Sequence, residues 1–479
     1  MGHKASLTIL IAAFLVLGAI YAFLTPPWQA PDEPAHYNYI SFLVREGRLP
    51  VLRMGDYPHS YLEEIKSRRF PPDMSIEPIR YEFHQPPLYY ILASPIYAIT
   101  GGSLLALRLF SVVIGATVVA VAFLLVRELF PERPELALGT ASFVAFVPMH
   151  TAMSSSVNND PLAELIIGLF LLEMVRLIKK GWPEEALWRP SVFIALGFLT
   201  KTTAYISFVL YLIIFGLLTW RRFPLKKELR LLAFSLWPLL LTLPWFARNM
   251  AVYGLTDPFG LARHDSIVVG QPRTSQWLEA MGAFGLLKAF LLTSFRSFWG
   301  QFGWMAVPMD ERVYGLLVLA CFLALWGFLH WLPQGWRALK DAQRLGLILL
   351  ALSLALTALS FLWYNLKFVQ HQGRYLFPAI IPLGLGFSLG LRESLKRKAA
   401  VTAGLILALV ALVLVAKGFI TGDWNRFTLA LLLTGTAFCV VKASIPAKWD
   451  EFIFALFFAG LAILSVLCPF VYIRPYLSP

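Results

Sequence analysis

The chain has 479 residues, of which 58% are hydrophobic and 14% are charged, and its mean hydropathy is +0.67. Soluble domains contain about 45–50% apolar and about 25% charged residues, so this composition excludes an ordinary water-soluble protein. The net charge of +13 does not require a nucleic-acid partner, because Lys and Arg accumulate in the cytoplasmic loops of membrane proteins.

The apolar residues form uncharged blocks of about 20 residues, the length of helix that crosses a hydrocarbon layer about 30 Å thick. The first block, Ala5–Leu24, has two interpretations, a cleaved signal peptide or a signal anchor. No clear small-x-small cleavage site follows it, which favours the anchor. We predict an all-α integral membrane protein with about thirteen transmembrane helices, at residues 5–24, 104–126, 136–153, 161–178, 189–200, 204–220, 231–247, 313–332, 345–363, 375–391, 399–420, 427–441 and 452–472.

Basic residues in the short connections indicate the orientation of these helices. With the N-terminus inside and the C-terminus outside, the cytoplasmic connections contain Arg176, Lys179, Lys180, Arg221, Arg222, Lys226, Lys227, Arg337, Lys340, Arg344, Arg392, Lys396, Arg397 and Lys398. This pattern predicts a multi-pass protein of the cytoplasmic (inner) membrane. Two long outer loops then lie at residues 25–103 and 248–312, where we expect juxtamembrane helices that cover the membrane domain.

One apolar segment, Pro86–Thr100, is too short for a span, with 15 residues that include three prolines. A full span here would move every later basic cluster to the outside. We therefore interpret the segment as an interfacial or re-entrant helix on the outer face.

Two adjacent acids, Asp32 and Glu33, follow the first span in a proline-rich turn near the outer bilayer surface. One interpretation is that they cap the helix that Pro34 opens. The other is that one of them acts as a base where a lipid-borne and a water-borne substrate meet. At a later outer turn, Asp160 precedes Pro161 and is placed to cap a helix, whether or not it also faces a site.

Isolated cations also lie at the outer ends of predicted spans. Lys201 stands between two apolar stretches, and a Lys at membrane depth either has a function or extends its amine to the surface. Arg374 begins a span close to His371, and its guanidinium fork suits a pair of phosphate oxygens. Arg248 is a weaker case of the same kind. Acids and cations gathered on one face suggest group transfer from a lipid phosphate.

Five motifs together resemble those of the GT-C membrane glycosyltransferases: Asp32-Glu33, HQPPLYY at 84–90, Asn159-Asp160, TKTTA at 200–204 and GRYLFP at 373–378. The resemblance extends over residues 5–390 and is nearest to protein O-mannosyltransferases, lipid A aminoarabinose transferases and bacterial polyprenyl-phosphate-sugar transferases. It implies a GT-C-like bundle with juxtamembrane helices in the first outer loop. We place a catalytic membrane domain at 1–391 and additional C-terminal transmembrane helices at 392–479.

The resemblance also implies a donor, a sugar on polyprenyl phosphate, and it implies roles for individual residues. Asp32 would be the base, or Glu33 if the loop turns the other way, and Asp160 matches the second outer acid. Lys201 and Arg374 match positions that contact the donor phosphate. The full set of candidate phosphate-binding residues is Lys201, Arg374, His371, Tyr375, His84 and Arg248.

The predicted reaction is an inverting transfer of the sugar to an acceptor hydroxyl on the outer face of the membrane, with a base taking the proton and cations stabilising the leaving phosphate. The alternative is a lipid or glycan transporter or flippase, which predicts mid-membrane charges and repeated halves. A divalent metal is a further open alternative, because Asp32, Glu33, His36 and Asp160 offer suitable ligands, although not at a metal-binding spacing. The sequence identifies neither the sugar nor the acceptor.

Overall fold

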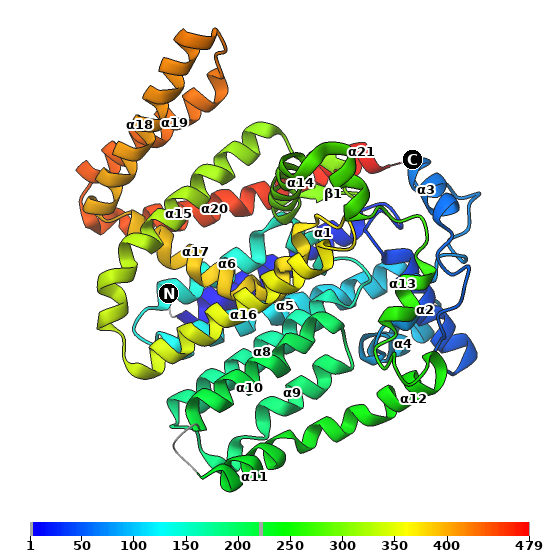
Figure 1. The fold of residues 1–479 in the computed structure, drawn as a ribbon. Helices are drawn as coiled ribbons and strands as arrows, with labels where there is room; N and C mark the ends of the chain where they lie inside the picture. The colour runs from blue at the N-terminus through cyan, green and yellow to red at the C-terminus, as the bar shows by residue number, and fades with distance from the viewer. Residues whose placement is uncertain (1–2, 220–223, 479) are drawn as a thin grey trace.

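The computed structural model describes residues 3–219 and 224–478, and helices account for nearly all of its regular structure (Figure 1). Two short strands, β1 (Gln301–Phe302) and β2 (Val307–Pro308), pair antiparallel. The α-helices are α1 (His3–Leu24), α2 (Glu33–Glu46), α3 (His59–Ser67), α4 (Leu88–Thr100), α5 (Leu104–Leu129), α6 (Pro134–Phe146), α7 (Pro148–Ser154), α8 (Asp160–Lys179), α9 (Arg189–Phe198), α10 (Ile206–Thr219), α11 (Leu225–Leu236), α12 (Leu243–Tyr253), α13 (Leu261–Ile267), α14 (Thr274–Trp299), α15 (Glu311–Ala338), α16 (Asp341–Asn365), α17 (Ile380–Ser394), α18 (Arg397–Thr421), α19 (Arg426–Ser444), α20 (Asp450–Cys468) and α21 (Arg474–Leu477).

The all-α membrane architecture is confirmed, but the number of about thirteen spans is not. In the described chain, 11 helices are long and apolar enough to cross a membrane, or up to 12 if the bent pair α6 and α7 counts as one span. Two predicted spans, 161–178 and 189–200, are not among these helices. The first corresponds to α8, which carries ionisable side chains near both ends, and the second to α9, which has 10 residues and is too short to cross a membrane. Arg221 and Arg222, part of one predicted cytoplasmic connection, lie outside the described residues.

The second long loop, which was predicted to lie outside at residues 248–312, contains α14, a helix of 26 residues that is apolar enough to span and is kinked at Gly282. Both of its ends contact the short segment 365–373. At the start, the Thr274 hydroxyl donates to the Asn365 carbonyl at 2.8 Å. At the end, the Ser297 hydroxyl accepts from the Gly373 amide at 2.7 Å. Because both ends contact one short segment, α14 bends back at Gly282 and does not run as one straight helix.

The segment predicted as interfacial forms α4, which has 13 residues and is shorter than a span. It packs against α2 and α5. Figure 1 shows α2, α3, α4 and α13 gathered at one end of the bundle, on the side where the C-terminus lies. This end of the molecule carries the sequence-predicted site.

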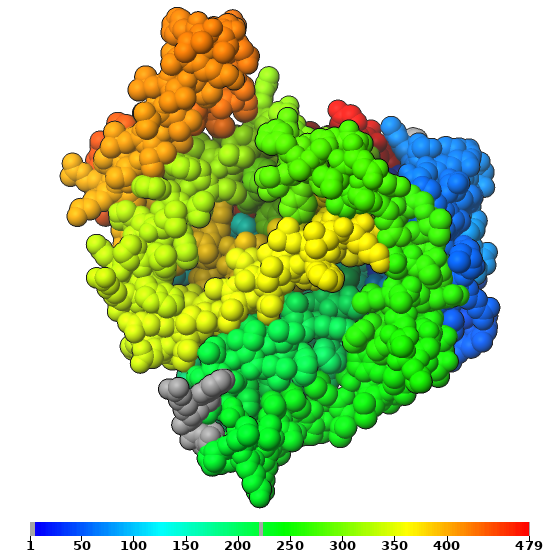
Figure 2. Space-filling view, in the orientation of Figure 1, coloured from blue at the N-terminus to red at the C-terminus, as the bar shows by residue number. Residues whose placement is uncertain are grey.

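The C-terminal helices do not form one separate unit. The hairpin of α18 and α19 stands clear of the body (Figures 1 and 2), but α20 returns to it. Phe454 and Phe458 of α20 belong to the same hydrophobic core as Phe14 of α1. The Tyr21 hydroxyl also donates to the Ser465 carbonyl at 2.8 Å. The α20 segment therefore packs with the main body, and it also contacts α19 of the hairpin through Phe457 and Asp450.

Candidate functional site

Asp32 immediately precedes α2, in a left-handed backbone conformation with φ of 66°. Its side chain makes no capping hydrogen bond to the helix. The carboxylate instead accepts from the Tyr81 hydroxyl at 2.7 Å and from Arg374 Nη2 at 2.5 Å. The helix-cap interpretation is therefore wrong for the Asp32 side chain, and the unusual φ directs the carboxylate away from the helix.

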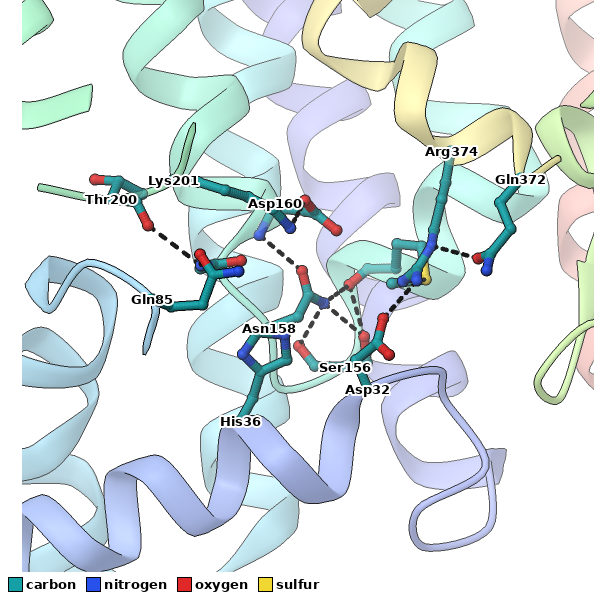
Figure 3. Close-up of polar contacts among 12 residues, drawn as sticks. Asp32, His36, Gln85, Ser156, Asn158, Asp160, Thr200, Lys201, Gln372 and Arg374 are labelled. Atoms are coloured by element: carbon teal, nitrogen blue, oxygen red, sulfur yellow. Dashed lines mark hydrogen bonds and ion pairs between the residues drawn. The ribbon is translucent and has the colours of Figure 1, made fainter. Parts of the chain in front are cut away.

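Arg374 lies in a 3-10 turn, Gly373–Ala379, that leads into α17. Its Nε donates to Gln372 Oε1 at 2.8 Å, and the residue is 6% exposed. A Cβ at Gly373 would stand 2.2 Å from the Ser294 carbonyl oxygen, so only glycine permits this close approach to α14. The turn thereby places the guanidinium against Asp32, 342 positions away in sequence (Figure 3).

A second ion pair lies beside the first (Figure 3). Lys201 Nζ donates to Asp160 Oδ1 at 2.5 Å, and the Lys201 side chain is 13% exposed. The N-cap of α8 is Asn159 and not Asp160, and Asn158 Oδ1 accepts from the Asp160 amide at 2.8 Å. The expectation that Asp160 caps its helix is therefore wrong, because its carboxylate pairs with Lys201. Lys201 itself does not extend to the open surface.

Both ion pairs shape the electrostatics around His36. Burial alone would raise the pKa of Asp32, but Arg374 outweighs burial and lowers that pKa from 3.8 to about 2. Burial lowers the pKa of His36, while Glu82 and Asp32 oppose the change and Lys201 adds to it. His36 Nδ1 and the Tyr90 hydroxyl are 2.8 Å apart. The site therefore holds an ionised carboxylate next to a histidine that favours its neutral form.

The Asp32–Arg374 pair faces a cavity of about 490 Å³, which we call the catalytic cavity after the role predicted for Asp32. Three predicted residues, Arg374, Tyr375 and His371, line it with Asp32. The lining also includes residues of the two long loops, 25–103 and 248–312, namely Tyr57, His59, Glu63, Lys66, His264 and Trp304. A volume of this size is typical of small-molecule sites.

Glu33 does not line the cavity. It is fully buried, and Arg108 Nε and Nη2 donate to its two oxygens at 2.8 and 2.6 Å. The amides of Val157 and Trp28 donate to the same carboxylate, each at 3.1 Å. Glu33 therefore ties α2 to α5 and to the turn before α8, and its placement disagrees with the alternative that it acts as the base.

We expect Glu33→Ala to destabilise the protein, because it leaves the buried Arg108 guanidinium without its counter-ion. Breaking a buried pair from one side costs about 3–5 kcal/mol. Thermal unfolding of the purified protein in detergent measures the loss. The matched control is Glu46→Ala, whose partner Arg48 is exposed. Equal stability of the two variants would contradict this role for Glu33.

The other three predicted phosphate ligands, Lys201, His84 and Arg248, do not line the catalytic cavity. His84 packs its ring 4.4 Å from that of His264, and its Nδ1 lies 3.0 Å from the Tyr81 carbonyl. Arg248 donates to the Pro50 carbonyl and stacks over Trp245. His84 and Arg248 link the two long loops, 25–103 and 248–312, and neither pairs with Asp32 or Arg374.

Several residues at the site were not predicted from the sequence. Tyr81 donates to Asp32, and Glu82 lines the cavity with an Oε2 atom that has no hydrogen-bond partner in the described chain. Both stand just before the HQPPLYY motif, so extending that motif by three residues would have found them. Arg108, the partner of Glu33, was detectable as a charge inside a predicted span.

The proposed metal ligands do not converge. Within residues 3–219 and 224–478, no group of three or more His, Cys, Asp or Glu side chains is placed to hold a metal ion. Asp32 and Asp160 each pair with a cation of the chain, and Glu33 is buried against Arg108. The donor set of Asp32, Glu33, His36 and Asp160 therefore does not fit a metal site.

Comparison with known proteins agrees with this architecture. No curated protein matches the chain. Among solved structures, ArnT from Cupriavidus metallidurans in the apo state is 15% identical, with a TM-score of 0.54 over 99% of this chain and 79% of that one. ArnT from the same organism bound to undecaprenyl phosphate is 15% identical, with a TM-score of 0.51 over 98% and 78%. The GT-C fold that the sequence motifs implied is thereby confirmed. The family model for the predicted membrane protein DUF2142 matches residues 74–383, and the chain belongs to that family.

Proposed function

We propose that the chain is an inverting glycosyltransferase that moves a sugar from a polyprenyl-phosphate donor to an acceptor hydroxyl on the outer face of the membrane. The observation that carries the proposal is the Asp32–Arg374 pair, which faces the catalytic cavity at the end of a GT-C-like bundle. The ArnT structure bound to undecaprenyl phosphate supports a donor of this class. A base and a phosphate-binding cation are the two groups that this chemistry needs.

In the mechanism, Asp32 accepts the proton of the acceptor hydroxyl. The acceptor oxygen forms a bond to the anomeric carbon from the face opposite the phosphate. The bond from that carbon to the phosphate oxygen breaks, and the polyprenyl phosphate leaves with the electron pair. Arg374 stabilises the charge on the leaving phosphate, and Lys201, held by Asp160, adds positive potential beside it.

The ion pair also links donor binding to base strength. Without a donor, Arg374 lowers the pKa of Asp32 to about 2, so the carboxylate is a weak base. A donor phosphate competes with Asp32 for the same guanidinium. When Arg374 turns to the phosphate, Asp32 loses the interaction that lowers its pKa and accepts a proton more readily. The base is thus activated only when a donor is present.

A transfer assay tests the proposal. The purified protein in lipid nanodiscs receives a polyprenyl-phosphate donor with a radiolabelled sugar, together with an envelope fraction as the source of acceptors. We expect the label to leave the polyprenyl lipid and to appear on a different molecule, with release of free polyprenyl phosphate. If proteoliposomes instead move the intact labelled lipid across the membrane, the transporter alternative is correct and the proposal fails.

A further inference from the structure

Backbone strain is concentrated around the catalytic cavity. In the described chain, seven non-glycine residues have positive φ, and one of them, Trp182, lies outside this region. The other six are Trp28, Asp32, Arg69, Phe70, Trp304 and Met305. A positive φ costs free energy in a residue with a side chain, and such residues cluster at ligand clamps and active sites. The predicted catalytic role explains the positive φ of Asp32, but it does not explain the positive φ of the other five residues.

Two of these five residues, Arg69 and Trp304, line a second cavity of about 470 Å³, which we call the outer trench. The trench shares Glu63, Lys66 and Trp304 with the catalytic cavity, so the two are neighbours along one wall. Arg69 lines the trench directly. The Trp304 indole donates to the Trp28 carbonyl at 3.0 Å and stacks on Phe70. Trp304 therefore belongs to the wall between the two cavities, and two other strained residues, Trp28 and Phe70, contact it.

One residue of the wall shared by the two cavities, Lys66, is held only by weak contacts. Lys66 Nζ lies 5.3 Å from the centre of the Trp304 ring and 2.5 Å from Glu63 Oε1. Glu63 is half exposed, so this ion pair is weakly held. A lysine side chain has four rotatable bonds and changes position easily. Lys66 lines both the outer trench and the cavity that contains Asp32.

The lining of the trench indicates the chemistry of its ligand. Aromatic rings from Trp304 and Tyr476 stand beside polar groups from Lys66, Arg69 and Gln29. Gln29 is 3% exposed, and its side-chain Nε2 has no hydrogen-bond partner among the described residues. Aromatic faces mixed with hydrogen-bonding groups suit a ligand that has both apolar ring faces and many hydroxyls.

A lipid would need a different lining. The apolar groove between α15, α19 and α20 is lined almost entirely by aliphatic and aromatic residues, including Leu316, Phe438 and Leu464. The trench lies instead among α3, the β1–β2 turn and the C-terminal residues. It also carries charges of both signs, which disfavours a uniformly charged polymer.

We propose that the outer trench binds a saccharide chain and that the acceptor of the transfer is therefore a glycan whose terminal hydroxyl reaches Asp32. The inference rests on the proposed function for the transfer step, but the trench binds the glycan whether or not transfer occurs. Trp304 and Lys66 stand at the boundary that the terminal sugar crosses.

A binding experiment without a donor tests the inference. Purified protein in nanodiscs is applied to an array of defined oligosaccharides and to a matched array of peptides. The variant Ser67→Trp fills the trench from an exposed position of α3, where a large side chain does not enter the core. The matched control is Glu64→Trp, an exposed position of the same helix that does not line the trench. A second variant, Lys66→Ala, removes a trench contact without adding bulk.

We expect the wild type and Glu64→Trp to bind a subset of the oligosaccharides equally. Ser67→Trp should lose this binding at least tenfold, and Lys66→Ala should weaken it, while both keep the thermal stability of the wild type. Peptide binding that depends on Ser67, or the absence of oligosaccharide binding, would overturn the glycan assignment. Glycan binding that is insensitive to both variants would overturn the trench as its site. Glycan binding together with failure of the labelled-donor assay would contradict the proposed transfer but would keep the trench as a glycan-binding site.

Discussion

Asp32→Asn is expected to abolish sugar transfer while the protein still folds and inserts. Loss of a general base typically reduces the rate by about 100- to 10,000-fold. Asparagine preserves the size of the side chain and can still accept from Tyr81, so the local structure is retained. Because Asn no longer holds Arg374 by charge, donor affinity should not fall. Single-turnover transfer with a labelled polyprenyl-phosphate sugar, and binding of unlabelled polyprenyl phosphate, measure the two effects separately.

The control for this variant is Asp73→Asn, which changes an exposed acid of the same loop whose partner is the exposed Arg68. It should transfer sugar at the wild-type rate. An Asp32→Asn protein that transfers normally would remove Asp32 as the base. Loss of transfer together with loss of thermal stability would assign Asp32 a structural role, since the catalytic role predicts an intact fold.

Arg374→Ala is expected to weaken donor binding and to slow the transfer step. The guanidinium is the only cation in contact with Asp32 among the described residues, and it faces the catalytic cavity. Removal of one group that stabilises developing charge typically costs about 100- to 1,000-fold in rate. Arg374→Lys keeps the charge but loses the planar fork, so it should recover part of the donor affinity. Binding of polyprenyl phosphate and single-turnover rates provide the measurement.

Arg374→Ala also changes the base strength of Asp32. Without Arg374, the burial that raises the pKa of Asp32 is no longer outweighed by the guanidinium, so its pKa should rise. The control is Arg48→Ala, which removes an exposed surface cation far from the cavity lining. Donor affinity that is equal in Arg374→Ala and Arg48→Ala would show that Arg374 only anchors the start of α17. A double variant with Asp32→Asn then reports how strongly the two side chains are coupled.

Asp32 and Glu33 are adjacent in the sequence but have different roles in the structure. Asp32 and Glu33 were both candidate bases, because both follow the same proline-rich turn, and only the family resemblance favoured Asp32. Arg108, which lies 75 positions from Glu33 in the sequence, binds the Glu33 carboxylate away from the cavity. The left-handed φ of Asp32 also separates the two acids. Neither feature has a local signal that ranks the two acids.

The sequence by itself determined the membrane environment, the position of most spans and the short helix α4, because hydropathy and helix length are local properties. It also determined that the acids and cations of the site lie at helix ends. Only the tertiary structure decided that Asp32 pairs with Arg374 and Asp160 with Lys201. The same is true of α14, whose two ends return to one segment. Such contacts join residues distant in the chain, and they depend on how whole helices pack and not on any single motif.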